Sequence, residues 1–219
     1  MFGKQFYHES LRKVVVAFGT IFNNIVIHRT NSDGDVVQKI KVPLAYSPKE
    51  KFLVSLEQQA NLQEDRAVAV TLPRMGFEIT GLSYDATRKI NKMQKLIRVK
   101  SGEDGKKMEY NYTPVPYNIN FNLYSFTATA ENGLQIIEQI LPFFQPEYTV
   151  TMRVVPELDL IRDIPIIMQN VQYEDTYTGD FTRRRAVIYT LNFTAKTYLY
   201  GPMSNQGVIK TVQADMGTD

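Results

Sequence analysis

The segment MEYNYTPVPYNINFNLYSFTATA, residues 108–130, constrains the fold more than any other part of the sequence. Polar residues alternate there with aromatic or aliphatic ones, so that Ile119, Phe121 and Leu123 share one face with Ser125. Alternation with a period of two is typical of a strand with one buried face. This is the clearest strand in the sequence, and it makes a β-sheet the starting point of the predicted fold.

Three other segments have helical patterns. Residues 8–22 place Leu11, Val14, Val15, Phe18 and Phe22 on one side of a short helix. Residues 47–60 begin with a helix-start signal, in which Ser47 caps, Pro48 takes the first helical position and Glu50 completes a capping box. Residues 131–143 form the third predicted helix, which we expect to end or kink near Pro142 and Pro146 because proline disrupts a helix interior.

The remaining regular segments read as strands. Residues 25–30 and 36–46 flank a turn at Gly34 and predict a hairpin. Further strands are predicted around Pro73, where the proline suggests an edge or bend, and at 149–155, 163–175 and 184–200. We therefore predict one α+β domain over residues 1–219, with a twisted, mainly antiparallel or mixed sheet flanked by a few helices. Within it, residues 86–112 are expected to form an extended arm or loop, and 203–219 a short C-terminal tail.

Glu138 and Gln139 lie inside the apolar pattern of the third helix and raise the question of buried chemistry. On a helix, Leu134, Ile137, Ile140, Leu141 and Phe144 form one broad stripe, which Ile136 and Phe143 widen. Glu131, Gln135, Glu138 and Gln139 fall largely on the other side, with Glu138 at the polar edge of the helix. No histidine, lysine or second carboxylate is placed beside Glu138 by a motif, which disfavours acid/base catalysis. We predict that Ile137, Ile140 and Leu141 are buried and that Glu138 is more exposed than they are.

Composition and motifs argue against several classes of protein. The chain has no cysteine and only two histidines, so thiolate chemistry is excluded and a metal site is disfavoured. It contains no phosphate-binding loop, no G-x-S-x-G elbow and no H-E-x-x-H motif. No segment is apolar for long enough to span a bilayer, and the N-terminus lacks the pattern of a secretion signal. We expect a non-enzymatic protein without cofactors, metal or membrane contact, made in a cytoplasm.

Charge is distributed unevenly along the sequence. Residues 1–100 contain 16 Lys and Arg against 9 Asp and Glu, a balance of +7, and residues 101–219 contain 9 against 14, a balance of −5; together they give the net +2. Such polarity suits either a nucleic-acid-binding face or a head-to-tail contact between copies. The charge asymmetry alone does not distinguish nucleic-acid binding from a contact between copies.

Two clusters of basic residues could bind partners. The first is a run without acids that could bind phosphates or simply form a solvated face: Arg88, Lys89, Lys92, Lys95, Arg98 and Lys100. The second is the triplet Arg183, Arg184 and Arg185, near the acidic turn at Glu174, Asp175 and Asp180. It could form salt bridges within the subunit or dock an acidic partner.

Five blocks distributed in order over nearly the whole chain resemble the tail sheath stabiliser proteins of T4-like contractile-tailed bacteriophages. They are MFGKQFYHESLRK with FGTIFNNIVIHR at the start, VPLAYSPKEKF (42–52), LPRMGFEITGLSYD (72–85), LQIIEQILPFFQP (134–146) and RRRAVIYTLNFTAKTYLYGP (183–202). The resemblance implies a fold related to phage tail terminators and a structural role in the virion. The sequence departs from the family's pattern at residues 129–133, where an acidic pair is expected. It also departs at the C-terminus, because longer members of the family continue beyond this point.

The resemblance also implies an assembly. Proteins of this family form a homohexameric ring at the head-proximal end of the tail, seated on the tube terminator and the terminal sheath ring and docking the head and neck. DNA passes through the channel without sequence-specific binding. We expect the 134–144 helix, including Phe143 and Phe144, and residues Arg183–Arg185 to contribute to assembly interfaces. The alternatives are a DNA-binding accessory protein that uses residues 88–100, a tube terminator or a neck connector.

Overall fold

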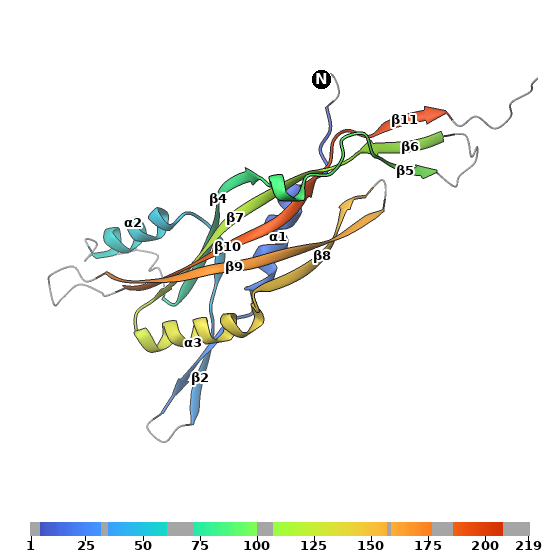
Figure 1. Cartoon of the computed structure of the whole chain (residues 1–219). Coiled ribbons are helices and arrows are strands. Elements are labelled where there is room, and N and C mark those ends of the chain that lie inside the picture. The colour runs from blue at the N-terminus through green and yellow to red at the C-terminus, as the bar shows by residue number, and fades with distance from the viewer. Residues whose placement is uncertain are drawn as a thin grey trace, which may run out of the picture.

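Strands predominate over helices in the computed structural model, which describes residues 5–31, 35–60, 72–99, 107–156, 159–176 and 186–207 (Figure 1). The helices are α1 (Ser10–Ile21), α2 (Lys49–Ala60) and α3 (Ala130–Ile140), with 3₁₀ turns η1 (Ala86–Arg88) and η2 (Leu141–Phe143). The strands are β1 (Val26–Thr30), β2 (Val36–Lys41), β3 (Leu44–Tyr46), β4 (Arg74–Tyr84), β5 (Lys95–Val99), β6 (Lys107–Tyr112), β7 (Val115–Thr127), β8 (Glu147–Val155), β9 (Leu160–Thr176), β10 (Ala186–Leu199) and β11 (Ser204–Gly207). The α+β prediction is confirmed.

A six-stranded mixed sheet forms the centre of the molecule, with strand order β3-β4-β7-β10-β9-β8. All neighbours are antiparallel except the short β3, which runs parallel to β4. The predicted alternating strand becomes β7, and it pairs with β10 without interruption from Val115–Leu199 to Thr127–Val187. Long, unbroken pairing at the centre explains why both strands could be recognised from their sequence patterns.

Helices α1 and α3 cover one face of this sheet and enclose the main core. Phe18 on α1 is fully buried and stacks on Phe121 of β7 at a ring-centroid distance of 4.3 Å. Phe22 and Phe144 pack against Phe193 of β10 from the same side. Burial of several phenylalanines in one cluster removes a large apolar area from water and stabilises this layer.

Helix α2 lies against one end of the opposite face. Its Phe52 packs on Phe126, and a Cβ on Gly76 of β4 would lie only 2.4 Å from the Phe52 ring. The capping box predicted for this helix is not formed, because α2 begins at Lys49 and the Ser47 hydroxyl is buried without a hydrogen-bond partner among the described residues. The buried position of Ser47 against the sheet overrides its local capping preference.

Two smaller sheets extend from the central one. Strands β1 and β2 form the predicted hairpin, which projects beyond α3, while its turn at Gly34 lies outside the described residues. Strands β11, β6 and β5 form a three-stranded sheet at the opposite end, where the chain runs from β6 into β7 and from β10 into β11 (Figure 1). The segment 86–112, expected as an arm or loop, supplies β5 and β6 of this extension. Most of the tail 203–219 lies outside the described residues, which end at residue 207.

Candidate assembly surfaces

Helix α3 contributes one candidate surface, and its contacts with the sheet decide which side faces outward. Thr129 caps the helix through a hydrogen bond from the Asn132 amide to its hydroxyl, at 3.4 Å. Gly133 lies so close to the sheet that a Cβ there would be 2.5 Å from the Tyr189 ring. The helix therefore packs tightly along the line of Gly133, Ile136, Ile137 and Ile140, which are all buried.

This packing confirms part of the predicted helical phase and corrects the rest. Ile137 and Ile140 are buried and Glu138 is exposed, as predicted. Leu134 and Leu141, expected on the buried stripe, are 58% and 38% exposed. The close approach at Gly133 orients α3 so that Ile136, expected at the margin of the stripe, is fully buried while the two leucines face outward.

The end of α3 separates two adjacent phenylalanines. The helix ends at Ile140 and a 3₁₀ turn containing Pro142 follows, as the proline predicts. Phe144 is buried between the rings of Phe22 and Phe193, whereas Phe143 is 66% exposed. Of the two residues expected at an assembly interface, Phe144 belongs to the core of the subunit and Phe143 is available to a partner.

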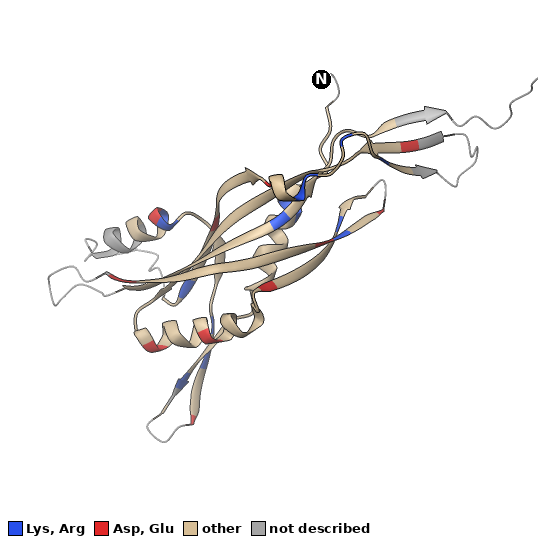
Figure 2. Cartoon of the chain, in the orientation of Figure 1, with Lys and Arg blue, Asp and Glu red and all other residues tan. Residues whose placement is uncertain are grey.

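An acidic and apolar stripe therefore faces outward on α3. Glu131, Leu134, Glu138 and Leu141 follow one another at spacings of three and four residues, which places them on one side of the helix. Figure 2 shows only acidic residues among the charges of α3. Exposed leucines between carboxylates are the kind of surface that packs against an apolar partner with a basic rim.

Two glutamines of α3 connect the helix to the β1–β2 hairpin. The Gln135 side chain accepts a hydrogen bond from the His28 amide at 2.9 Å and donates one to the His28 carbonyl at 3.1 Å. Gln139 makes the same pair of bonds with Val26, at 3.4 and 2.9 Å. Each glutamine amide takes the place of a peptide group of a neighbouring strand. The outward-facing N–H and C=O groups of Val26 and His28 on β1 are therefore hydrogen-bonded.

The candidate basic surface is divided between internal and exposed residues. The Arg88 guanidinium lies 2.8 Å from Asp85, donates to the Asn118 side chain at 2.7 Å and lies over the Tyr198 ring. Hydrogen bonds from the Thr87 and Arg88 side chains hold the pKa of Asp85 well below its usual range. Arg88 thus connects η1 to the sheet instead of forming part of a solvated basic face.

Other members of the run lie on the surface. Lys89 and Lys92 are exposed, and the Lys95 ammonium lies 4.6 Å from the Tyr110 ring centroid and 5.5 Å from that of Tyr112. Arg98 is part of β5, but its side chain lies outside the described residues, as does Lys100. The triplet Arg183, Arg184 and Arg185 also lies outside them. The described part of this region offers separated lysines rather than a continuous basic stripe.

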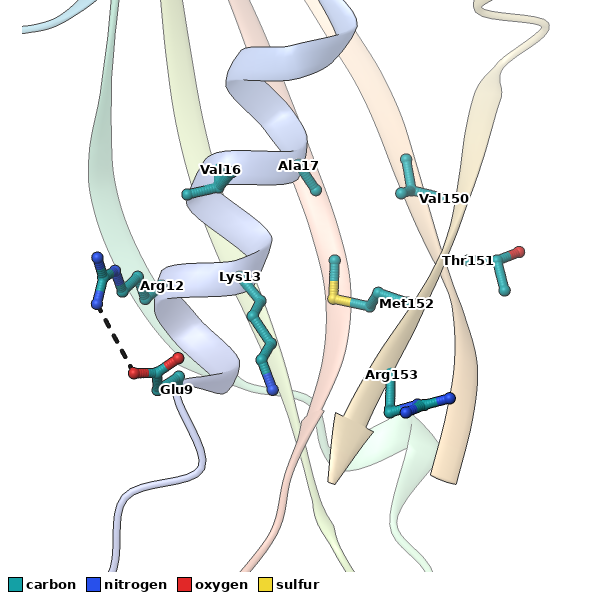
Figure 3. Close-up of a pocket in the computed structure, with 9 residues that line it drawn as sticks. All are labelled: Glu9, Arg12, Lys13, Val16, Ala17, Val150, Thr151, Met152 and Arg153. Atoms are coloured by element: carbon teal, nitrogen blue, oxygen red, sulfur yellow. Dashed lines mark ion pairs between the residues drawn. The ribbon is translucent and has the colours of Figure 1, made fainter. Parts of the chain in front are cut away.

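A shallow groove separates α1 from the edge strand β8 (Figure 3). Its apolar floor comes from Val16 and Ala17 on the helix and Met152 on the strand. Charged groups surround it, and those that pair do so at the surface: Arg12 with Glu9 at 3.7 Å and Arg153 with Asp159 at 3.0 Å. Exposed pairs of this kind contribute little to stability, so they are free to rearrange when a partner binds.

Metal ligation is not a feature of the residues that the structure describes. Among them, no group of three or more His, Asp or Glu side chains is placed to hold a metal ion. None of the helices described is both long and apolar enough to cross a membrane.

Sequence reasoning missed the roles of Gln135 and Gln139, which it assigned to a polar helix face. Their spacing of four residues places them on one side of α3, and that side is not the one carrying Leu134 and Leu141. A pair of amides at this spacing beside a predicted hairpin is the signal that could have identified the contact.

Comparison with known proteins agrees with a structural role. The profile of the T4-like virus Myoviridae tail sheath stabiliser family matches residues 5–219. The chain is also 33% identical over 221 aligned residues to the tail completion protein gp15 of Enterobacteria phage T4, an alignment that covers 98% of this chain and 79% of the phage T4 protein. Both similarities extend over nearly the whole chain.

Proposed function

We propose, since this chain belongs to the tail sheath stabiliser family of T4-like Myoviridae, that it forms a hexameric ring at the head-proximal end of a contractile tail. The family and the phage T4 relative are structural tail proteins, so the chain is a component of the virion and not an enzyme. The match over residues 5–219 is the observation that carries the proposal, because it includes every described element of the fold.

The ring terminates the tail and stabilises the extended sheath. Its partners are the tube terminator and the terminal sheath ring on one side and the head and neck proteins on the other. DNA passes through the central channel without sequence-specific contacts. A closed ring needs two different surfaces on each subunit that fit each other head to tail. The acidic stripe of α3, the groove beside β8 and the basic hairpin supply different surfaces of this kind.

Phe143 is the residue that we assign most directly to an interface. It is 66% exposed, whereas the next residue, Phe144, is buried in the core. A large exposed aromatic side chain beside Leu141 is a suitable anchor for a neighbouring protein. Arg183–Arg185 are assigned to the same role, as a docking site for acidic groups on a partner.

Native mass spectrometry and electron microscopy test the proposal on the purified full-length chain, alone and with isolated tails. We expect a hexamer in at least one of the two conditions and density at the head-proximal tail end. The variant Phe143→Ala should weaken assembly, and Leu82→Ala provides a control at an exposed apolar position on β4 that belongs to none of the surfaces named above. A strictly monomeric chain that never binds tails would overturn the proposal.

The same preparation distinguishes the alternatives. Density at another level of the tail would identify a tube terminator or a neck connector instead. Tight DNA binding that weakens steeply with salt would indicate a nucleic-acid-binding accessory protein. The internal position of Arg88 and the aromatic contacts of Lys95 argue against that second alternative, because they engage two of the six basic residues within the chain.

A further inference from the structure

The second half of β9 is an open sheet edge. Strand β8 pairs with β9 only from Leu160 to Ile167, and the Met168 amide then donates to the Pro146 carbonyl at 3.3 Å. On the other side, β10 continues to pair with β9 as far as Thr176. Among the described residues, no strand lies beside residues 169–176 on the side that β8 has left.

This open half of β9 is exposed on both of its faces. Every residue from Gln169 to Asp175 is exposed, including Val171 at 37% and Tyr173 at 51%. Proteins usually shorten, cover or guard such an edge, because unpaired peptide groups are a template for another strand. The charges present here are Glu174, which lies 2.6 Å from the Lys49 ammonium, and Asp175, which accepts a hydrogen bond from Tyr173.

A second open edge lies on β2, and the glutamine contacts show which of its peptide groups face outward. The peptide groups of Val26 and His28 face Gln135 and Gln139, so those of the alternate β1 residues face β2. Val26 and His28 lie opposite Lys41 and Lys39 in the antiparallel register. The peptide groups of Lys39 and Lys41 therefore face away from β1, where no described strand pairs with them.

The two edges are complementary in length and charge. Strand β2 has six residues, Val36–Lys41, and the open half of β9 has eight, residues 169–176. Lys39 and Lys41 are basic, whereas Glu174 and Asp175 are acidic. Figure 2 shows basic segments along the hairpin, with acid near its tip, and acidic segments at the end of β9. Val36 and Val37 on β2, which are 49% and 70% exposed, can pack against Val171 and Tyr173.

We propose that β2 of one subunit adds as a strand to the open half of β9 of the next subunit, and so forms the head-to-tail contact of the ring. This inference rests on the proposed hexamer and assigns its interface. Addition of a strand to an exposed edge supplies main-chain hydrogen bonds, and the side chains provide specificity. The occupant is a second copy because one chain carries both edges with opposite charge, and in Figure 1 the hairpin and the end of β9 lie on different parts of the subunit.

Disulfide cross-linking tests this contact without background, because the chain has no cysteine of its own. Val37→Cys is combined in one chain with cysteine at Val171, Gln172 or Tyr173, which samples both faces and adjacent registers. We expect at least one pair to give a ladder of covalent oligomers up to the closed ring under oxidising conditions. Chains with one cysteine each, mixed in equal amounts, should stop at the dimer.

A proline substitution tests the main-chain bonds directly. Lys39→Pro removes an amide that faces outward, and an edge strand tolerates proline at such a position. Lys39→Ala is the matched control, because it removes the same charge and keeps the amide. We expect Lys39→Pro to raise the protein concentration needed for assembly about tenfold or more relative to Lys39→Ala, since a main-chain hydrogen bond is lost at each contact.

The outcomes separate this inference from the proposed function. If the wild-type chain forms rings but no cysteine pair cross-links and Lys39→Pro assembles like Lys39→Ala, the interface is elsewhere and the hexamer stands. If cross-links form only between this chain and another tail protein, the assignment of a second copy is overturned. If the wild-type chain forms no ring with or without tails and no pair cross-links, both proposals fail.

Discussion

The two faces of the six-stranded sheet differ in chemistry although the same strands build both. Toward α1 and α3, strand β7 presents Ile119, Phe121 and Leu123, which are all fully buried. Toward the other side, residues between them are Asn120 and Asn122, which are only partly buried. On that side the Thr194 hydroxyl bonds the side chains of Asn120 and Gln169, at 3.1 and 2.8 Å.

This difference shows where the subunit obtains its stability and where it can offer surface. The apolar face is closed by two helices, and water is removed from it on folding. Of the described helices, only α2 covers the polar face, at one end, and the amides and hydroxyls of this face bind one another across the strands. A sheet of this design is held together from one side and leaves polar groups and strand edges for contacts with other chains.

Truncation of neighbouring side chains on β7 should show the largest difference in stability between the two faces. Phe121→Ala removes a fully buried ring that stacks on Phe18, and we expect a loss of about 3–5 kcal/mol in the free energy of unfolding. Asn122→Ala, one residue away on the polar face, should cost about 1 kcal/mol or less. Urea denaturation of both variants measures the contrast, and equal losses would refute the assignment of the core to one face.

Glycine substitutions give a second, smaller test. A Cβ on Gly133 would lie 2.5 Å from the Tyr189 ring, so Gly133→Ala must move α3 or the ring and should cost about 1–3 kcal/mol. A Cβ on Gly81 would come no closer than 3.8 Å to the Asn120 side chain, so Gly81→Ala should change stability by less than about 0.5 kcal/mol. Thermal unfolding compares the two, and a destabilised Gly81→Ala with an unaffected Gly133→Ala would contradict the packing described.

Sequence patterns predicted the sheet and its helices because local periodicity encodes burial. The alternation around Phe121 and the proline at 142 each act through a local rule, and both elements lie where they were expected. The orientation of α3 was only partly predictable, because the contact between Gly133 and Tyr189 joins residues far apart in the chain. The open edge of β9 was not predictable for a related reason: it depends on where β8 ends, not on the residues of β9.

The glutamine contacts add a polar interaction to the helix-covered side. Gln135→Leu or Gln139→Leu leaves two peptide groups of β1 to water, and each should destabilise the hairpin by about 1 kcal/mol. Hydrogen exchange should therefore accelerate at the His28 amide in the first variant and at the Val26 amide in the second. Glu138→Gln, an exposed substitution between the two, is the control and should leave both amides unchanged.

The smallest predicted effect concerns Tyr124 on the polar face, whose contribution to stability should depend on pH. Burial of the phenol, together with its hydrogen bond to Glu78 at 2.6 Å, raises the pKa of Tyr124 to about 12 from an ordinary 10.0. The unfolded chain therefore loses this proton first as the pH rises. The contribution of Tyr124 to stability is complete below about pH 10 and declines between pH 10 and 12.

Comparison with Tyr124→Phe isolates this effect from the other tyrosines. The variant should be less stable than the wild type by about 1 kcal/mol below pH 10, because the hydrogen bond to Glu78 is lost. The difference should narrow between pH 10 and 12, since only the wild type has the group that ionises. Urea unfolding at several pH values measures the difference, and a gap that stays constant to pH 12 would show that Tyr124 ionises equally in both states. In that case the Tyr124 hydroxyl would be as accessible to water in the folded protein as in the unfolded chain.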